Sequence, residues 1–220
     1  MKSDNKDVSA LSGRFITFEG GEGVGKSTNV AFLKKYLEQK GKEVVVTREP
    51  GGTPLAEKMR ALLLQAWQET ILPDTELLLF FAGRLQHLSE VIIPALSAGR
   101  WVICDRFLDA TYAYQGYGRG IALERIKALT DWCGIHLRPD LTILLDLPVA
   151  MGQQRAAERG APDRFEAEQT VFFDRVRQGY LHMAQLDSDR YRLIDASAPL
   201  MHVQQALQQA VEGLTAVVRM

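Results

Sequence analysis

Residues 20–27 of the chain are Gly-Gly-Glu-Gly-Val-Gly-Lys-Ser, a full match to the pattern G-x-x-x-x-G-K-[ST]. The match follows directly on an apolar run at residues 14–19 (RFITFE) and precedes a predicted helix at residues 27–39. Glycines allow the backbone to curl so that successive N–H groups point into one anion-sized hollow, and the helix adds its positive end. The segment therefore predicts a phosphate-binding loop, or P-loop, between a strand and a helix.

Two side chains of this loop have predicted chemical roles. Lys26 is expected to reach the β- and γ-phosphates of a nucleotide and to act in catalysis, while the Ser27 hydroxyl is expected to bind Mg²⁺. The expected cofactors are therefore ATP and Mg²⁺. The alternative is a glycine-rich turn with a solvated lysine. The predicted cofactor-binding residues are Gly20, Gly21, Glu22, Gly23, Val24, Gly25, Lys26, Ser27 and Thr28.

Glu22 is an unusual member of this loop, because a carboxylate in a hollow built for anions repels the phosphates. It is tolerated if it points toward a hydroxyl, an arginine or the metal. We therefore predict a contact from Glu22 to a sugar hydroxyl of a second substrate. The alternative is a solvent-facing loop residue.

Five short runs, rich in β-branched or aromatic residues, are predicted to be strands, with room for crossover helices between them. Several are almost continuously apolar, which is typical of parallel strands covered on both faces. The sequence thus predicts a single-domain α/β fold: a five-stranded parallel sheet with helices on both faces and a small lid segment. The predicted strands are residues 14–19, 43–48, 101–105, 141–147 and 191–195, and the lid is at about residues 155–168.

The net charge, the apolar runs and the cysteines limit which partners the protein is expected to bind. The net charge of -1 gives no bulk attraction for nucleic acid or anionic lipid, and no apolar run is expected to reach the length needed to cross a bilayer. Cys104 and Cys133 show neither metal-ligand spacing nor a disulfide framework. We expect a cytoplasmic protein that binds neither nucleic acid nor membrane. Residues 1–13 are expected to be a disordered extension, and residues 14–220 to form the single domain.

A P-loop alone fits kinases, GTPases, motor ATPases and ATP-driven binding modules. The chain lacks the Asn-Lys-x-Asp element of a GTPase, and its arginines and aromatics at strand ends suit a second, anionic, planar substrate. Residues 47–53 (TREPGGT), 79–84 (LFFAGR) and 105–119, which begin Asp-Arg-Phe, resemble motifs of bacterial thymidylate kinases. Residues 159–166 (RGAPDRFE) are similar to the lid of that family. With the P-loop, these motifs run in family order from residue 14 to about residue 180.

The resemblance implies a homodimeric enzyme that transfers the γ-phosphoryl group of ATP to dTMP, giving dTDP and ADP for dTTP synthesis. The departures are residues 1–13, Gly83 where a bulkier residue is common, and Ala161-Pro162 in the lid. None of them removes a functional side chain. A kinase for another nucleoside or nucleotide is the second enzyme hypothesis. A P-loop ATPase or a nucleotide-dependent binding module is the alternative from another class.

Phe80 and Arg84 stand four residues apart and share one face of a predicted helix. Through the resemblance, Phe80 is predicted to stack on thymine, and Arg84 to donate to a ring carbonyl oxygen. Taken without the resemblance, an apolar Phe at this spacing is a core residue, and Phe81 keeps that interpretation.

Arg48 and Arg106 end two predicted strands, so both are expected to grip the acceptor phosphate and to act in catalysis. A structural salt bridge is the alternative for each. Asp105 ends its strand as a Walker-B carboxylate does, and is expected to hold Mg²⁺ directly or through water. Pairing with an arginine is its alternative. The resemblance also raises a cis peptide bond between Glu49 and Pro50.

Thr111, Tyr114 and Gln115 complete the predicted substrate-binding set of Glu22, Arg48, Phe80, Arg84, Arg106, Thr111, Tyr114 and Gln115. The resemblance places Thr111 and Tyr114 against the base and the 2′ carbon of the sugar. A Tyr ring there would reject a ribose hydroxyl. The alternative for Tyr114 is a core position.

Arg155, Arg159 and Arg164 flank the predicted lid, where they are expected to close over the phosphates and neutralise the transition state. We assign Arg159 to the catalytic set, although the sequence leaves open which lid arginine acts. A solvated charged face is the alternative. The second pKa of a nucleoside monophosphate lies near 6, so its attacking oxygen is largely anionic and no general base is expected.

Overall fold

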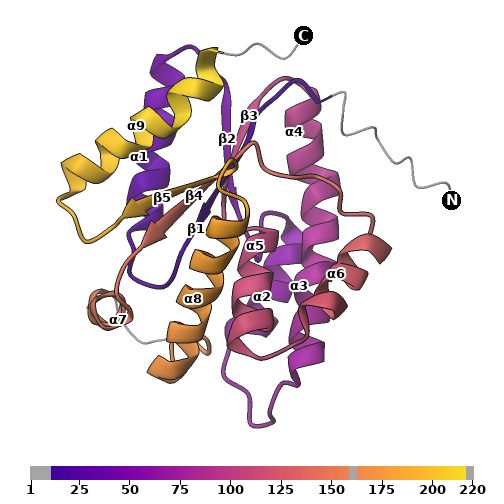
Figure 1. Ribbon diagram of the computed structural model, residues 1–220. Coiled ribbons are helices and arrows are strands. Elements are labelled where there is room, and N and C mark those ends of the chain that lie inside the picture. Colours follow the sequence, from indigo (N-terminus) through magenta and orange to yellow (C-terminus); the bar gives the residue numbers. More distant parts are fainter. Residues whose placement is uncertain (1–10, 159–162, 217–220) are drawn as a thin grey trace, which may run out of the picture.

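The structure, a computed structural model, describes residues 11–158 and 163–216. A five-stranded parallel sheet lies at its centre, with the strand order β2-β3-β1-β4-β5 (Figure 1). This confirms the predicted fold, and each predicted strand lies within one residue of the observed bounds at either end. The strands are β1 (Phe15–Glu19), β2 (Val44–Arg48), β3 (Trp101–Asp105), β4 (Leu141–Asp146) and β5 (Tyr191–Asp195).

Helices cover both faces of the sheet (Figure 1). The helices α1 and α9 lie on one face, and most of the others lie on the opposite face. The α-helices are α1 (Lys26–Gln39), α2 (Pro54–Leu64), α3 (Pro73–His87), α4 (Ile93–Ser97), α5 (Leu108–Thr111), α6 (Leu123–Trp132), α7 (Val149–Ala157), α8 (Thr170–Leu186) and α9 (Leu200–Ala216). Two π-helical segments, η2 (Leu88–Ile92) and η3 (Tyr112–Gly118), continue α3 and α5.

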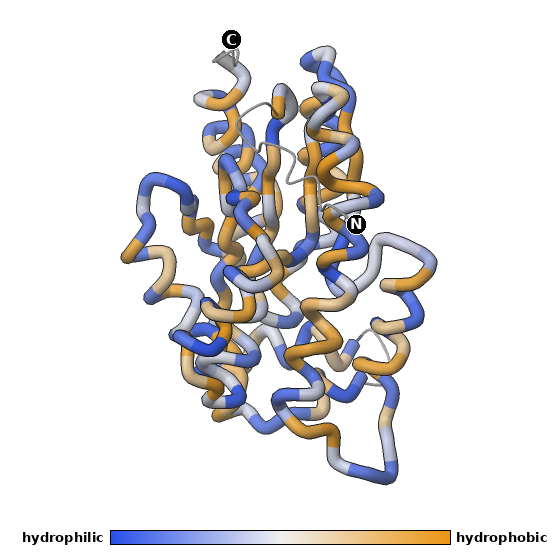
Figure 2. The backbone as a smooth tube through the Cα atoms, turned by 90° about the vertical axis from the view of Figure 1, so that its right-hand side faces the viewer, coloured by the Kyte–Doolittle hydropathy of each residue, from blue (hydrophilic) through white to orange (hydrophobic). Residues whose placement is uncertain are grey.

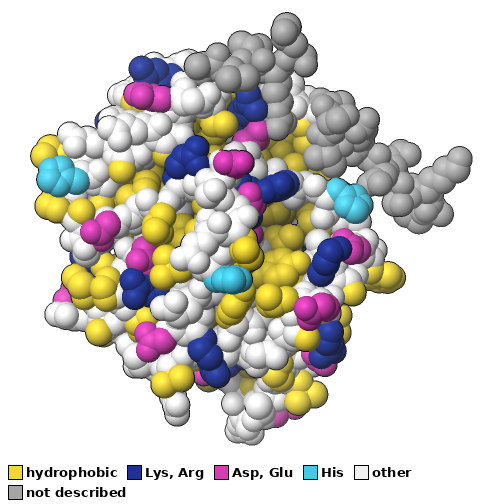
Figure 3. Space-filling view, in the orientation of Figure 1, with side chains coloured by type: hydrophobic (Ala, Val, Ile, Leu, Met, Phe, Trp, Pro, Cys, Tyr) yellow, Lys and Arg dark blue, Asp and Glu magenta, His cyan; other side chains and the backbone are white. Residues whose placement is uncertain are grey.

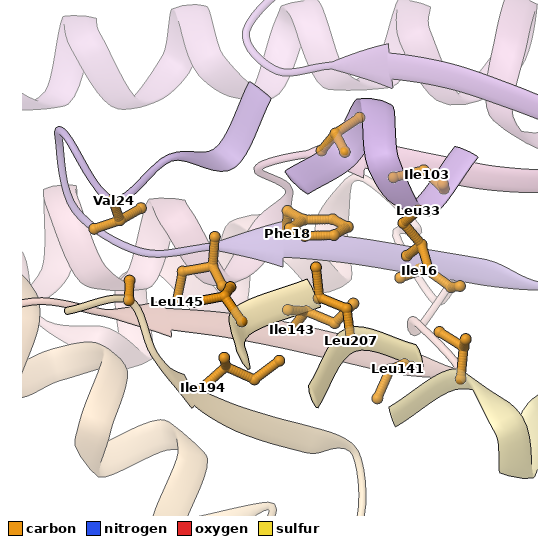
Figure 4. Close-up of a cluster of buried hydrophobic side chains, with 14 of the residues drawn as sticks. Ile16, Phe18, Val24, Leu33, Ile103, Leu141, Ile143, Leu145, Ile194 and Leu207 are labelled. Atoms are coloured by element: carbon orange, nitrogen blue, oxygen red, sulfur yellow. The ribbon is translucent and has the colours of Figure 1, made fainter. Parts of the chain in front are cut away.

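Successive side chains along a strand point to opposite faces of the sheet, and here they build an apolar layer on each face. Ile16 and Phe18 of β1 are completely buried against Leu33 of α1 and Leu207 of α9, and their side chains point toward one another (Figure 4). Phe15 faces the other way, into a second apolar cluster with residues of α3 and α4. Along the helices, hydrophobic positions alternate with hydrophilic ones (Figure 2), as amphipathic helices on a sheet require. Burial on both faces fixes the sheet beneath the loops that follow its strands.

Close contact between η3 and α8 depends on two glycines. A Cβ atom at Gly118 would lie 2.6 Å from the Phe172 ring, and one at Gly179 would lie 2.6 Å from the Tyr117 ring. Real Cβ atoms do not approach other atoms so closely. The two helices therefore pack at a separation that only glycine permits at these positions.

The first described residues correct the expected start of the domain. Leu11 is buried in the cluster that contains Phe15, and the Gly13 N–H donates to the Leu96 carbonyl oxygen at 2.9 Å. Residues 11–13 are therefore part of the folded domain, because an apolar side chain and a backbone hydrogen bond fix them. The expectation of a disordered extension to residue 13 is wrong for these three residues. Residues 1–10 lie outside the described chain.

By length and composition alone, one helix of the described chain, Pro73–Ser97, could cross a membrane. This is weak evidence for a span, because core helices meet the same criteria. Glu76, Arg84 and His87 of this helix are buried in polar contacts with the rest of the fold. On the surface shown in Figure 3, basic and acidic side chains are interspersed, in keeping with a net charge of -1.

Candidate active site

A cavity of about 540 Å³ opens at the carboxyl ends of β1, β2 and β3. Its walls come from the P-loop, the ends of β2 and β3, α2, α3, α5, η3, and the lid residues Asp163, Phe165 and Glu166. The structure thus brings together nearly all of the predicted site residues. Those that line the cavity are Glu22, Gly23, Val24, Gly25, Lys26, Ser27, Thr28, Arg48, Phe80, Arg84, Asp105, Arg106, Thr111, Tyr114 and Gln115. Gly20 and Gly21 line a second, smaller pocket, and Arg159 lies outside the described residues.

The P-loop curls around its own lysine. The Lys26 ammonium donates to the carbonyl oxygens of Gly20 at 3.2 Å and Gly21 at 2.8 Å. Desolvation of this group, together with the nearby Arg106 charge, lowers the pKa of Lys26. Gly23 has a φ of +69°, and a Cβ atom there would lie 2.1 Å from the Gly152 carbonyl oxygen. The loop therefore needs glycine at position 23 in order to pass beneath α7.

Glu22 points away from the phosphate hollow and binds Arg106 and Tyr114. Arg106 Nη2 donates to Glu22 Oε1 at 2.6 Å, and the Tyr114 hydroxyl donates to the same oxygen at 2.9 Å. The Arg106 guanidinium also lies over the Tyr114 ring, 4.7 Å from its centroid. Arg106 thus forms the ion pair that was its structural alternative, while it still lines the cavity.

The backbone at Arg106 is unusual, since φ is +68° in a residue that is not glycine. Two hydrogen bonds fix it there. The Arg106 N–H donates to the Phe18 carbonyl oxygen at 2.9 Å, and Arg106 Nη1 donates to the Gly20 carbonyl oxygen at 2.9 Å. Strained backbone is held in place at functional sites when its surroundings over-determine it. Arg106 is held against both the P-loop and β1.

Asp105 is suited to a metal ion. Its Oδ1 atom is buried and has no hydrogen-bond partner among the described residues. Asp105 and Ser27 line the same cavity. No group of three or more His, Cys, Asp or Glu that could hold a metal occurs in the described chain. Mg²⁺ needs no such group, because it binds through one or two carboxylates, waters and the phosphates of its nucleotide. These two oxygen donors fit Mg²⁺.

Arg84 is almost fully buried, at 2% exposure, and each of its three side-chain nitrogens has different surroundings. Nε donates to Glu49 Oε2 at 2.6 Å, and Nη2 donates to Thr111 Oγ1 at 2.9 Å. Nη1 has no partner in the described chain. Arg84 lines the cavity, which makes this buried Nη1 atom a candidate donor to a ligand.

Glu49 and His87 are site residues that sequence reasoning missed. Glu49 accepts from Arg84 and also bonds His87 Nδ1 at 3.0 Å, and His87 Nε2 bonds Thr47 Oγ1 at 2.6 Å. The Glu49–Pro50 peptide bond is cis, as the resemblance suggested. Glu49 directly follows Arg48 at the end of β2, which is the signal that would have pointed to it. Arg48 itself pairs with Glu57 at 3.0 Å and is exposed.

Glu19, at the end of β1, was also missed as a site residue. It is completely buried, and it accepts hydrogen bonds from the Phe107 N–H and the Tyr180 hydroxyl, both at 2.8 Å. Burial, with a smaller contribution from the Asp109 charge, raises the pKa of Glu19 to about 8. Tyr180 also lies 3.3 Å from Arg106 Nη1, so Glu19 supports the same wall of the cavity.

The aromatic residues divide as predicted between cavity and core. Phe81 is buried at 2% exposure in the apolar cluster of Phe15. Phe80 is half-buried, lines the cavity, and packs edge-on against Phe165 at 6.0 Å between centroids. Tyr114 is buried among the rings of Phe165, Phe172 and Tyr180, as its core alternative predicts, and it also lines the cavity.

Arg164 corrects the expected set of lid arginines. Its Nη2 donates to Glu76 Oε2 at 2.7 Å, and its Nε donates to the Leu63 carbonyl oxygen at 2.8 Å. It therefore fastens the lid to α2 and α3 and is not directed at phosphates. Arg155 does line the cavity, and it donates to the Ala196 carbonyl oxygen at 3.1 Å.

Comparisons with known proteins agree on one family. A family model described as thymidylate kinase matches residues 18–207. The chain is 56% identical over 204 residues to the thymidylate kinase of Methylococcus capsulatus, covering 93% of this chain and 97% of that protein. It is 57% identical over 204 residues to that of Pseudomonas fluorescens, with the same coverage. The crystal structure of thymidylate kinase from Ehrlichia chaffeensis matches with a TM-score of 0.74 at 35% identity, covering 91% of this chain and 99% of that one.

Proposed function

The chain belongs to the thymidylate kinase family, and we propose that its cavity holds dTMP beside the P-loop while the γ-phosphoryl group of ATP is transferred to it. The products are dTDP and ADP, and dTDP is the precursor of dTTP. The P-loop binds the donor, and the space between α3 and η3 binds the acceptor.

One observation carries the choice of acceptor. Among the described residues, the donor Arg84 Nη1 and the acceptor Gln115 Oε1 have no hydrogen-bond partner, and both residues line one cavity. Thymine presents the complementary pair on adjacent atoms, the O4 acceptor and the N3–H donor. The half-buried Phe80 ring, also in the wall, supplies an apolar surface for the face of the base.

The sugar lies, in this proposal, between the base site and the P-loop, beside Tyr114 and Glu22. The Tyr114 hydroxyl is fixed by its 2.9 Å hydrogen bond to Glu22. A fixed, buried ring leaves a ribose 2′-hydroxyl neither space nor a partner, and an unpaired hydroxyl is costly in a desolvated site. This supports a preference for the deoxyribonucleotide.

Catalysis then rests on position and charge. The attacking phosphate oxygen of dTMP is mostly anionic at neutral pH, so no side chain has to remove a proton. Arg48 and Arg106 orient the acceptor phosphate, and Lys26 neutralises charge on the donor phosphates. Ser27 and Asp105 would hold Mg²⁺, which when bound supplies further neutralisation of the phosphates. Arg159 is proposed to act from the lid.

A homodimer is proposed on the basis of exposed apolar side chains on neighbouring helices. Leu55 and Leu62 stand seven residues apart on α2, as Leu78 and Leu85 do on α3, and all four are exposed. Residues seven apart share a helix face, so these form an apolar surface that a second copy would cover. Sedimentation of the purified chain should give the mass of a dimer, and a monomer at micromolar concentration would contradict the proposal.

The free cysteines and the net charge of the chain support a cellular location and a class of partner. Both cysteines, Cys104 and Cys133, are free, which supports a reducing cytoplasm. The substrates are small molecules, and the net charge of -1 supports a protein without nucleic-acid or membrane partners.

The direct test offers purified protein ATP and Mg²⁺ with dTMP, dUMP, UMP, dCMP or thymidine, and follows ADP. The highest kcat/KM is expected for dTMP. Faster turnover of another acceptor would replace the substrate assignment. ATP consumption that ignores every acceptor would replace the kinase assignment with an ATPase.

A further inference from the structure

Glu76 of α3 is a buried carboxylate placed just behind the wall of the cavity. It is 1% exposed and does not line the cavity itself. Gln115 Nε2 donates to its Oε1 at 2.8 Å, and Arg164 Nη2 donates to its Oε2 at 2.7 Å. Arg119 contacts both oxygens at 3.3 Å. In each of these contacts the partner donates an N–H group, so both carboxylate oxygens of Glu76 act only as hydrogen-bond acceptors.

Because Glu76 only accepts hydrogen bonds, it determines which end of the Gln115 amide faces it. An amide can present either its NH₂ group or its oxygen to a neighbour, and the two ends have nearly the same shape. A carboxylate bound by two guanidinium groups offers only acceptor oxygens. The NH₂ group of Gln115 must therefore face Glu76, and Oε1 must face the other way. Gln115 lines the cavity, and Oε1 receives no hydrogen bond within the described chain.

We propose that Glu76 is a positioning residue that sets base specificity, because it holds the oxygen of Gln115 toward N3 of the bound pyrimidine. This inference rests on the proposed function. Thymine and uracil carry a hydrogen on N3 and match an acceptor. The N3 atom of cytosine is itself an acceptor, and its amino group would meet the Nη1 donor of Arg84. Cytosine is thus opposed at both points, and the discrimination depends on the amide being turned one way.

The two arginines explain why a carboxylate can occupy this buried place. An isolated buried charge is expensive, and it is tolerated when it is paired and its oxygens are hydrogen-bonded. Arg119 has a second acidic partner, Glu168, at 2.5 Å, and Arg164 is anchored to α2. The guanidinium groups are held from outside the cavity, so they fix the carboxylate independently of any ligand.

The test compares Glu76→Gln with wild type in kcat/KM for dTMP and for dCMP. The new side chain can keep its oxygen on Arg164 Nη2 and Arg119 Nη2 and turn its own NH₂ toward Gln115, which then reverses. The ratio of kcat/KM for dTMP to kcat/KM for dCMP is expected to fall about tenfold or more. The reason is that Gln115 then presents a donor to N3, which opposes the N3–H of thymine and matches the N3 acceptor of cytosine. A merely structural Glu76 predicts an equal loss for both nucleotides, and that result would overturn the inference.

Glu168→Gln is the matched control. It also removes one carboxylate charge from Arg119, but it leaves the contact between Glu76 and Gln115 intact. Its ratio of dTMP to dCMP should equal that of wild type. A fall like that of Glu76→Gln would also overturn the inference, because charge alone would then explain both.

Gln115→Met keeps the proposal testable if Glu76→Gln fails to fold. This variant keeps the length of the side chain and removes the amide, so discrimination against dCMP should be lost; a retained ratio would contradict the inference. Failure of the proposed function looks different, because wild type itself would then show no preference for dTMP among the acceptors.

Discussion

Arg106 Nη2 lies 2.6 Å from Glu22 Oε1, so the residue that follows β3 is locked to the loop that follows β1. The pair joins the proposed acceptor-phosphate ligand to the donor-binding loop. One contact thereby fixes the relative position of the two halves of the site, which is the main contribution a protein makes to phosphoryl transfer.

Arg106→Lys should therefore lower kcat for dTMP by about 100-fold, because a lysine keeps the charge but not the forked geometry. A coupled assay for ADP measures this. Arg125→Ala is the control, since Arg125 pairs with Asp74 where both side chains are more than half exposed, at 62% and 55%. Its kcat should not change. An Arg106→Lys enzyme within about twofold of wild type would contradict the proposed role.

Arg84→Ala should raise KM for dTMP by about tenfold or more and leave KM for ATP nearly unchanged. It should also destabilise the fold by about 3 kcal/mol or more, because Glu49 is left buried without its guanidinium partner. Arg14→Ala is the matched control, since Arg14 pairs with Asp140 at 2.9 Å, also largely buried, away from the cavity. It should lower stability without changing KM for dTMP. Equal losses for dTMP and ATP with Arg84→Ala would count against base recognition.

Phe80 and Phe81 are adjacent residues with different expected roles, so their alanine variants can be compared directly. Phe81→Ala removes a ring that is 2% exposed and should cost about 3–5 kcal/mol of unfolding free energy, with KM for dTMP unchanged in the folded enzyme. Phe80→Ala should cost less stability and raise KM for dTMP. Denaturant melts and steady-state kinetics measure the two effects. The opposite assignment of stability and KM effects would refute the predicted division.

Glu19 makes stability depend on pH. Its pKa rises from 4.5 to about 8 on folding, chiefly through burial. Between these values the folded carboxyl keeps its proton and the unfolded one loses it, so stability is lost as pH rises from about 4.5 to 8. Glu19→Gln should therefore gain stability relative to wild type at pH 8, by about 3–4 kcal/mol more than at pH 5. Urea melts at the two pH values check this, and a pH-independent difference would show that Glu19 does not titrate in this range.

The fold, the P-loop and the residues at the strand ends could be predicted from the sequence because they depend on local patterns, whereas the base-site residues Phe80, Arg84, Thr111 and Tyr114 were predicted through the family resemblance. The strand runs and the P-loop spacing are local, and the residues that end parallel strands must meet at one edge of the sheet. Arg48, Asp105 and Arg106 reached the cavity for this reason.

What could not be predicted depends on partners distant in the sequence. Glu76 is an ordinary helix residue until Gln115 and Arg164 are brought to it by the fold. Arg164 was expected near the phosphates because a positive charge in a lid suggests that role. A buried carboxylate 88 positions away pairs with it instead. The packing of Leu11 likewise depends on a distant apolar cluster.

The glycine contact between η3 and α8 bears on how this enzyme could be given new substrates. Because the Phe172 and Tyr117 rings already occupy the space beside Gly118 and Gly179, a larger residue at either glycine would force η3 and α8 apart. Room for an enlarged nucleobase is more readily made at Phe80, which lines the cavity and is only half-buried. Attempts to broaden the acceptor range should start there and leave η3 untouched.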